Sequence, residues 1–415
     1  MLQFPASLRM AAALPNLLQD EGLTTVEGGA GPTPQGGRLW LLRIGLFELQ
    51  RPKEQADDWV WIVDHTVQLG TVKVLLIVGL RLSQWERQER GPLGHHDLQV
   101  VLMEPTEKSD GDLVQAQLER AAAATGVPRA ILSDGCRELN KGIRQFRETH
   151  AETAGLQDLK HKLARLLEGE LTKDQRWPAF LQTCAHLRKK TQQTEWAFVA
   201  PPATKEKARF MNLGELIRWA AKSRCFLDAP KFPTEFHPAS DRLEELLSPL
   251  REYDAALPEW HEMIELISQS MDEVRQQGYH CGLKLALQGR LPPARTPAAT
   301  RLVEQILEFA GEQSAQARPG EHLPGSSEAI ESLIGKGKRL EGQHSKGGFT
   351  RMVLGMAAAV VQPTTDYIQQ AFEQVQTKDV LGWARLTLGP SLHALRRQTL
   401  GRITPDQIQD KLQTA

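Results

Sequence analysis

The stretch that decides the fold is WVWIVDHT, residues Trp59–Thr66. Apolar side chains occupy both the odd-numbered positions 59–63 and the even-numbered positions 60 and 62, which predicts a central strand buried on both faces. Asp64 lies at the end of this apolar run. Burying a carboxylate without a partner costs free energy, so Asp64 is a candidate functional residue.

The sequence around this strand predicts a sheet. KVLLIVGL (73–80) and DLQVVLME (97–104) have the length and apolar content of strands, and Pro105 is expected to end the second of them. Helical spacing follows in 112–124, then a short strand in PRAILSDG (128–135), a helix in 137–146 and a fifth strand within 152–159. Three strands in succession, then a helical crossover into another strand, predict an α/β fold with a five-stranded mixed sheet of the ribonuclease H type.

The remaining segments differ in composition. GLTTVEGGAGPTPQGG (22–37) contains few apolar groups, and apolar residues recur at i, i+3, i+4 and i+7 between about 166 and 322. We therefore expect a flexible Gly/Pro-rich tail at 1–37, a short helical segment at 38–56, the first part of the core at 57–165, an all-helical insertion at 166–322, and core completion with C-terminal helices at 323–415. The helix within 38–49 is interpreted either as a helix packed on the core or as the remnant of a helix-turn-helix.

Composition limits the setting of the protein. The 415 residues carry a net charge of −1, which argues against an overall basic surface but allows a local basic stripe. The four cysteines are far apart and contain no CxxC pair, which favours a reduced cytoplasmic setting. No stretch approaches the roughly 20 apolar residues of a spanning helix, so no membrane association is expected.

Two further acidic residues occupy positions comparable to that of Asp64. Asp134 ends a short apolar strand, and Glu331 lies in SSEAIESLIGKGKR (326–339), at the start of a predicted helix. Hard cations such as Mg²⁺ require oxygen ligands, and two of them about 3.5–4 Å apart can activate the attacking oxygen at a phosphodiester and stabilise the leaving one. Glu328 shares a helix face with Glu331 and is the rival third ligand.

Three sequence blocks carry a family resemblance. They are IVDHTVQLGTVKVLLIVGL (62–80), AILSDGCRELNKGI (130–143) and SSEAIESLIGKGKR, and together they make the chain similar to bacterial insertion-sequence transposases of the DDE type, which have a ribonuclease H-like catalytic core. The resemblance covers residues from about 38 to the C-terminus. It includes a helical insertion between the second Asp and the Glu.

The resemblance implies a function. Asp64, Asp134 and Glu331 would be the catalytic residues and bind two Mg²⁺ or Mn²⁺ ions. Water would cleave a phosphodiester at an element end, and the freed 3′-hydroxyl would attack target DNA. Double-stranded DNA would be the partner, with a homodimer as a candidate assembly in the DNA complex, in a bacterial cytoplasm and associated with the nucleoid.

The same resemblance extends to other side chains. In several such families Lys and Arg follow the catalytic Glu by about two turns, here Lys338 and Arg339. An Asp-x-x-His often follows the fifth strand, here Asp158 and His161, as groups behind the metal ligands or in contact with DNA. The alternative for this pair is an N-capping Asp with a surface His on the first helical turn.

Basic residues cluster around the third block, and backbone phosphates are natural partners of such stripes. The predicted DNA-contacting residues are Lys336, Lys338, Arg339, Lys346 and Arg351. The alternative is a solvated helix face.

One departure from the family separates two hypotheses. Such transposases usually begin with a helix-turn-helix domain that reads the element ends, whereas this chain has only the short helix within 38–49 at that point. The first hypothesis is a metal-dependent transposase. The second is a truncated, non-catalytic DNA-binding relic of one.

Overall fold

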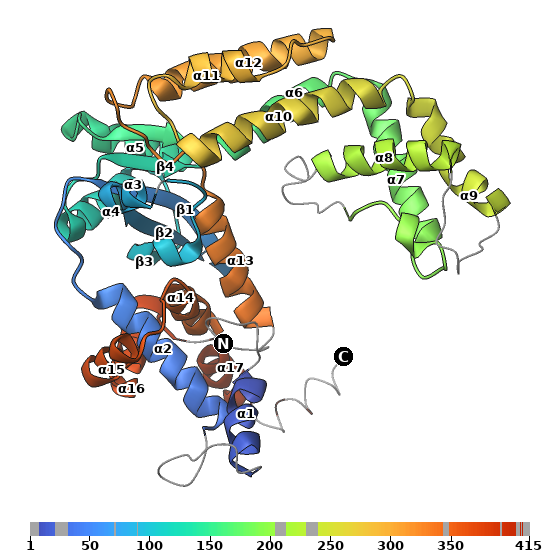
Figure 1. Ribbon diagram of the computed structural model, residues 1–415. Helices are drawn as coiled ribbons and strands as arrows, with labels where there is room; N and C mark the ends of the chain where they lie inside the picture. The colour runs from blue at the N-terminus through green and yellow to red at the C-terminus, as the bar shows by residue number, and fades with distance from the viewer. Residues whose placement is uncertain are drawn as a thin grey trace. The chain divides into compact units, whose positions relative to one another are not determined.

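The chain forms two compact units in a computed structural model (Figure 1). Unit 1 contains Met1–Gln88, Pro92–Gly155 and Ser327–Ala415, and unit 2 contains Glu89–Gly91 and Leu156–Ser326. The structure describes residues 8–20, 32–69, 72–88, 90–203, 213–229, 240–342, 348–390, 392–403, 407 and 409. The predicted helical insertion at 166–322 falls within the range of unit 2.

Five strands form one mixed sheet. They are β1 (Trp59–Leu69), β2 (Val72–Arg81), β3 (Gln99–Thr106), β4 (Ala130–Ser133) and β5 (Ala154–Gln157). The order across the sheet is β3-β2-β1-β4-β5. β1 pairs antiparallel with β2 and parallel with β4, and β2 pairs antiparallel with β3. This order and these directions are those of a ribonuclease H-like sheet, which confirms the predicted fold class.

The centre of the sheet is β1, and its first five residues are at most 1% exposed. Trp59, Trp61 and Val63 pack in one core with side chains of α4 (Gly111–Thr125) and α5 (Arg137–Thr149). Burying a large apolar side chain contributes about 1.5–3 kcal/mol, so this face is a major source of stability. The sequence of alternating apolar positions correctly predicted burial on both sides.

Helices from outside the strand region of the sequence also pack around β1. α2 (Pro34–Gln50) packs against α14 (Gly348–Ala359), and α13 (Glu328–Gly342) and α14 both contact β1. The Thr66 hydroxyl lies 4.0 Å from the sulfur of Met356 on α14. Thr66 shares a strand face with Ile62, opposite to Trp61 and Val63, because side chains alternate along a strand. The sheet of unit 1 is therefore covered on both faces.

Unit 1 contains further helical elements. They are α1 (Leu8–Asp20), α3 (Leu82–Arg87), η1 (His95–Asp97), α15 (Thr365–Gln374), α16 (Thr377–Trp383), η5 (Ala384–Leu388), α17 (Leu392–Thr399) and η6 (Leu400–Arg402).

Three sequence predictions for unit 1 need correction. Residues 8–20, expected to belong to a flexible tail, form α1, because an alanine-rich stretch favours helix and Ala12 is buried. α2 begins at Pro34 rather than near Arg38, because Thr33 caps it by accepting the Gly36 N–H at 3.0 Å. β3 continues through Pro105 rather than ending before it, since an edge strand tolerates a missing N–H.

Unit 2 is helical in the part that the structure describes. Its elements are α6 (Leu159–Leu171), α7 (Arg176–Thr191), η2 (Ala197–Val199), α8 (Leu213–Asp228), α9 (Ser240–Leu247), η4 (Ser248–Tyr253), α10 (Leu257–Gln277), α11 (Leu283–Arg290) and α12 (Pro297–Ser314). The helical spacing of this segment predicts eight core positions. Seven of them are buried and Ile267 is half-buried; the buried ones are Leu243, Leu246, Leu247, Leu250, Met263, Ile264 and Leu266.

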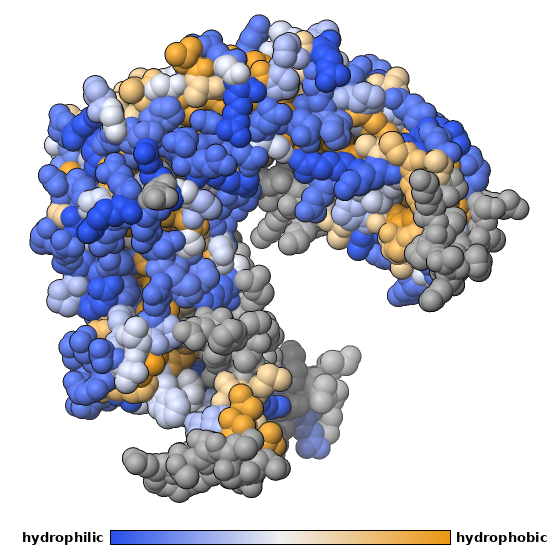
Figure 2. All heavy atoms as spheres, viewed as in Figure 1, coloured by the Kyte–Doolittle hydropathy of each residue, from blue (hydrophilic) through white to orange (hydrophobic). Residues whose placement is uncertain are grey.

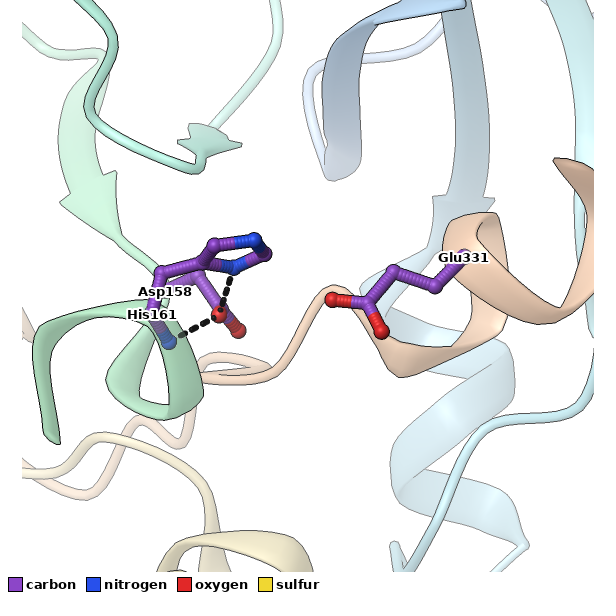
Figure 3. A group of neighbouring side chains, drawn as sticks. All are labelled: Asp158, His161 and Glu331. Atoms are coloured by element: carbon purple, nitrogen blue, oxygen red, sulfur yellow. Dashed lines mark hydrogen bonds and ion pairs between the residues drawn. The ribbon is translucent and has the colours of Figure 1, made fainter. Parts of the chain in front are cut away.

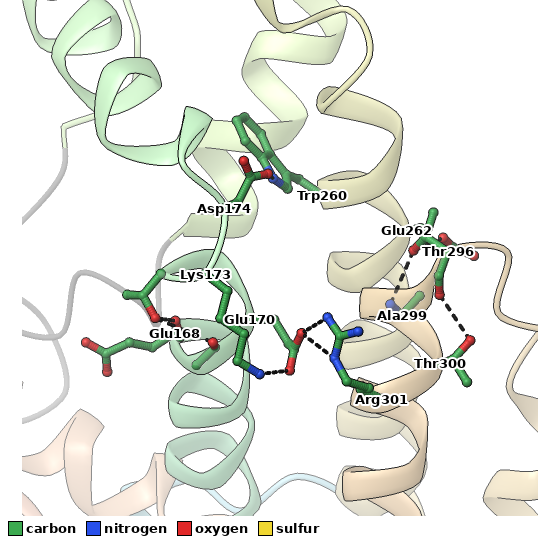
Figure 4. Close-up of polar contacts among 12 residues, drawn as sticks. Glu168, Glu170, Lys173, Asp174, Trp260, Glu262, Thr296, Ala299, Thr300 and Arg301 are labelled. Carbon is green, nitrogen blue, oxygen red and sulfur yellow. Dashed lines mark hydrogen bonds and ion pairs between the residues drawn. The ribbon is translucent and has the colours of Figure 1, made fainter.

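Buried carboxylates connect these helices (Figure 4). Glu170 on α6 accepts hydrogen bonds from Lys173 at 2.7 Å and from Arg301 on α12 at 2.6 Å, and its side chain is only 1% exposed. Asp174, after α6, accepts the indole N–H of Trp260 on α10 at 2.9 Å. A buried charge is tolerated when it is paired in this way, so these contacts fix the helices relative to one another.

The outer surface is mostly hydrophilic, with apolar atoms exposed in separate groups (Figure 2). Met10, Leu14 and Leu17 on α1 are more than half exposed. Across the described residues, every helix is too short or too polar to cross a bilayer.

A buried carboxylate also organises the end of α2. Glu48 is 2% exposed and accepts hydrogen bonds from Arg51 Nε at 2.5 Å, Lys53 Nζ at 3.0 Å and the Tyr367 hydroxyl at 2.6 Å. Burial alone would raise the pKa of Glu48, but Arg51 and Lys53 hold it below its usual value. Burial, with the nearby charge of Arg51, lowers the pKa of Lys53 to about 8. The Glu48 carboxylate, which both cations share, offsets only part of this effect.

We predict that Gly45→Ala destabilises unit 1. A Cβ atom at Gly45 would lie 2.0 Å from the Leu354 carbonyl oxygen, so α2 and α14 must separate. The free energy of unfolding should fall by about 1–3 kcal/mol in urea denaturation. Gly355→Ala on α14 is the control, because no atom lies within 4 Å of its Cβ position. It should be neutral or stabilising by up to about 1 kcal/mol. Equal losses in the two variants would contradict the close approach.

We predict that Lys53 makes stability rise with pH. The unfolded lysine has its ordinary pKa of 10.5 and the folded one about 8. Between these values the unfolded state binds more protons, so folding becomes more favourable as pH rises. Urea denaturation at pH 7 and pH 10 should show the unfolding free energy of the wild type rising by about 1–3 kcal/mol relative to that of Lys53→Met. If the difference in unfolding free energy between the wild type and Lys53→Met does not change with pH, the pKa of Lys53 is not lowered in the folded state.

Candidate active site at the ends of two parallel strands

Asp64 and Asp134 occupy equivalent positions on neighbouring strands. The last in-register pair between the parallel strands β1 and β4 is Val63 with Ser133, and each aspartate is the next residue. Alternation along β1 directs Asp64, like Ile62, toward the face opposite α4 and α5. Asp134 directly follows β4, so the structure places the first two predicted site residues next to each other in the register of two neighbouring strands.

The chain turns sharply after β4, and that turn holds Asp134. Gly135 has a φ of 78°, which a residue with a Cβ adopts at a cost. The Asp134 Oδ1 accepts the Cys136 N–H at 2.8 Å, and the Asn140 side-chain amide donates to the Gly135 carbonyl at 2.9 Å. These contacts tie the carboxylate to the first turn of α5. Sequence analysis did not single out Cys136 or Asn140, although an Asp-Gly directly before a helix is a known turn signal.

Glu331 comes from the first turn of α13, a helix that contacts β1 (Figure 3). Its backbone N–H donates to the Ser327 carbonyl at 3.1 Å, and its side chain is half-buried. Ala329, Ile330 and Leu333 are buried and anchor the helix. Glu328 begins the same helix and is also half-buried. Acidic residues are favourable in a first helical turn, so both glutamates suit their position in the helix.

The three carboxylates are carried by β1, by the turn after β4 and by α13, all within unit 1. In the described part of the chain they do not form a set whose ligand atoms all lie within 4.8 Å of one another. A two-ion site does not require that spacing. With ligand bonds of about 2.1 Å and ions about 4 Å apart, carboxylates on opposite sides of the pair are separated by up to roughly 8 Å.

The residue after Asp64 connects β1 to the loop before α4. His65 Nε2 lies 2.7 Å from the Ser109 hydroxyl, directly before the cap of α4. Burial lowers the pKa of His65, and the nearby charge of Lys73 lowers it further. Burial also raises the pKa of the Cys136 thiol to about 12. Both groups are therefore neutral at neutral pH and leave the charge at this edge to the carboxylates and Lys73.

Asp158 and His161 form a pair at the start of α6 in unit 2 (Figure 3). Asp158 is fully buried and accepts the His161 N–H at 2.8 Å, which is the geometry of an N-cap. Its Oδ2 also lies 2.6 Å from His161 Nδ1. The His161 side chain is 26% exposed, so it is less accessible than the surface histidine of the alternative interpretation. A role for this pair in chemistry stays a prediction.

The predicted DNA-contacting residues fall mostly where side chains cannot be described. Lys346 lies outside the described residues, and so do the side chains of Lys338, Arg339 and Arg351. Lys336 is described, and its Nζ lies 2.9 Å from His95 Nε2 and 3.2 Å from the Ala359 carbonyl oxygen at the end of α14. A cation at a helix C-terminus is favourable, so Lys336 stabilises the contact between α13 and α14.

We predict that Lys336→Met lowers stability without changing DNA affinity. Loss of the contact to the Ala359 carbonyl should cost about 1–2 kcal/mol of unfolding free energy. The salt dependence of DNA binding should stay unchanged, because no phosphate contact is lost. Lys338→Met is the matched comparison and should reduce the slope of log affinity against log salt by about 1. A reduced slope in Lys336→Met would show that Lys336 contacts a phosphate.

Comparison with known proteins gives similarity to solved structures. No family model matches the chain, and no curated protein matches it. The Drosophila P element transposase strand transfer complex is similar at 12% sequence identity, over 87% of this chain and 91% of that chain, with a TM-score of 0.40. The fold class therefore rests on the order and directions of the strands in unit 1.

Proposed function

We propose that the protein is a DNA transposase that cleaves and joins DNA strands with divalent metal ions. The observation that carries the proposal is the pairing of β1 with β4, which ends at Val63 and Ser133 and leaves Asp64 and Asp134 side by side. The acidic first turn of α13, a helix in contact with β1, supplies the third carboxylate.

The donor set fits a hard cation. Asp64, Asp134 and Glu331 offer only carboxylate oxygens, which Mg²⁺ and Mn²⁺ prefer, and each of the three side chains is half-buried. Two such ions, when bound, would activate the attacking oxygen and stabilise the leaving oxygen of a phosphodiester. The protein itself would hold the ligand oxygens on elements that are fixed by packing and hydrogen bonds. Asp64 lies on a central strand, and Asp134 is held by the turn into α5.

The proposed reaction has two steps at this site. Water attacks a phosphodiester at an element end and releases a 3′-hydroxyl. That hydroxyl then attacks a phosphodiester of target DNA in line, and the new strand joint forms as the old bond breaks. The partners would be element ends and target DNA, joined in a complex with a homodimer of the protein. We further propose a bacterial cytoplasmic, nucleoid-associated location, which the reduced cysteines allow.

We predict that Asp64→Asn, Asp134→Asn and Glu331→Gln each reduce metal-dependent nicking by about 100-fold or more, because each removes a charged ligand from a site that contributes several kcal/mol. The substrate is duplex DNA with the inverted repeats that flank the gene, and the measurement is strand cleavage in Mg²⁺ or Mn²⁺. DNA binding should persist in all three variants.

Two controls sharpen this experiment. Asp112→Asn changes an exposed carboxylate on α4 that pairs with Lys141, and it should cleave like the wild type. Glu328→Gln tests the rival third ligand, and a loss equal to that of Glu331→Gln would reassign the ligand. Binding without metal-dependent cleavage in the wild type would support the non-catalytic relic instead.

A further inference from the structure

A cavity lies in unit 1 near the start of β1. It has a volume of about 300 Å³ and is lined by the end of α2, the β2–α3 junction, the start of β3 and the link from α14 to α15. Arg81 lines it and pairs with Trp59, the first residue of β1. Asp64 is five residues further along the strand, roughly 17 Å away at 3.3–3.4 Å per residue. The cavity is therefore separate from the proposed active site.

Two arginines in the wall are each held by a carboxylate. Arg51 donates from Nε and Nη2 to Glu48, and Nη2 also donates to Gln99 at 2.9 Å. Arg81 donates from Nε to Asp58, and its Nη1 lies 2.5 Å from Glu54. Within the described residues, these hydrogen bonds and ion pairs use neither Arg51 Nη1 nor Arg81 Nη2, and the Tyr367 hydroxyl lies beside the Arg51 guanidinium. Each guanidinium is thus fixed in place, with one nitrogen outside these contacts.

The other charged and polar groups of the wall are compatible with an anion. The Glu48 carboxylate is already satisfied by Arg51, Lys53 and Tyr367. Asp97 accepts the Gly94 N–H at 2.7 Å. Glu54 and Asp58, the partners of Arg81, do not line the cavity. His96 does, with its Nδ1 3.2 Å from the Val360 carbonyl oxygen, which orients the ring.

The arrangement of donors selects the shape of the anion. A planar carboxylate prefers the two parallel N–H groups of one guanidinium. In Arg51 these groups already bind Glu48, and Arg81 is already bound to Asp58 and Glu54. The remaining donors belong to two separate side chains. A tetrahedral oxyanion, whose oxygens point in several directions, can accept from both at once.

We propose that this cavity binds a small phosphate-bearing ligand, inorganic phosphate or a phosphate monoester, between Arg51 and Arg81. The volume is at the lower end of the range for small-molecule sites and leaves room for a substituent beyond the phosphate. The ligand contacts α2, β2 and the segment before α15, so it stabilises the packing of these elements against the sheet. The proposal does not depend on the activity of the Asp64 site.

The test is calorimetric titration of the full chain with inorganic phosphate and with glycerol phosphate. Arg81→Lys keeps a positive charge beside Asp58 and Glu54 but loses Nη2, and it should weaken phosphate binding by about tenfold or more. Arg120→Lys is the matched control, because Arg120 pairs with Glu104 on the exposed surface of α4, and it should bind phosphate like the wild type.

A second measurement does not depend on folding of the variants. Crystals of the wild type soaked in tungstate, a phosphate mimic, should show anomalous density between Arg51 and Arg81. The proposal is overturned if neither phosphate titration nor tungstate density detects the site, or if Arg81→Lys binds phosphate unchanged. Displacement of phosphate by a blunt, unphosphorylated DNA duplex would overturn the small-ligand assignment and assign the anion to a DNA backbone.

Discussion

The parallel pairing of β1 with β4 is the constraint on which the rest of unit 1 depends. Val63 and Ser133 form its last pair, and the chain turns away immediately afterwards at Gly135. Asp64 and Asp134 therefore follow this last pair at the same level of the sheet. Antiparallel pairing of these strands would place the two aspartates at opposite ends of the sheet, so the direction of β4 matters as much as its position.

That pairing requires layers on both faces of the sheet. Trp59, Trp61 and Val63 are covered by α4 and α5, and the close approach of these two helices is possible because Gly142 lies against Val114 and the Gly111 backbone. On the other face, α13 and α14 contact β1. α13 brings the third carboxylate, so the helix that completes the layers also completes the candidate site.

The sequence was sufficient for the central strands and for the placement of the acidic residues on them. Apolar runs bounded by turns mark β1, β2 and β4, and Asp64 and Asp134 are conspicuous because each ends such a run. Other features depend on tertiary context. Pro105 continues β3 because β3 is an edge strand, and edge position follows only from the complete sheet order. The contact of Lys336 with the Ala359 carbonyl was not predicted, because it depends on how α13 and α14 pack.

The central claim is that Asp64 and Asp134 ligate the same divalent ion. The most direct measurement is anomalous diffraction from crystals of the full chain grown with Mn²⁺. The account predicts an anomalous peak about 2.2 Å from a carboxylate oxygen of each aspartate, with Glu331 at the same ion or at a second one about 4 Å away. Mn²⁺ bound elsewhere, with none between Asp64 and Asp134, would contradict it.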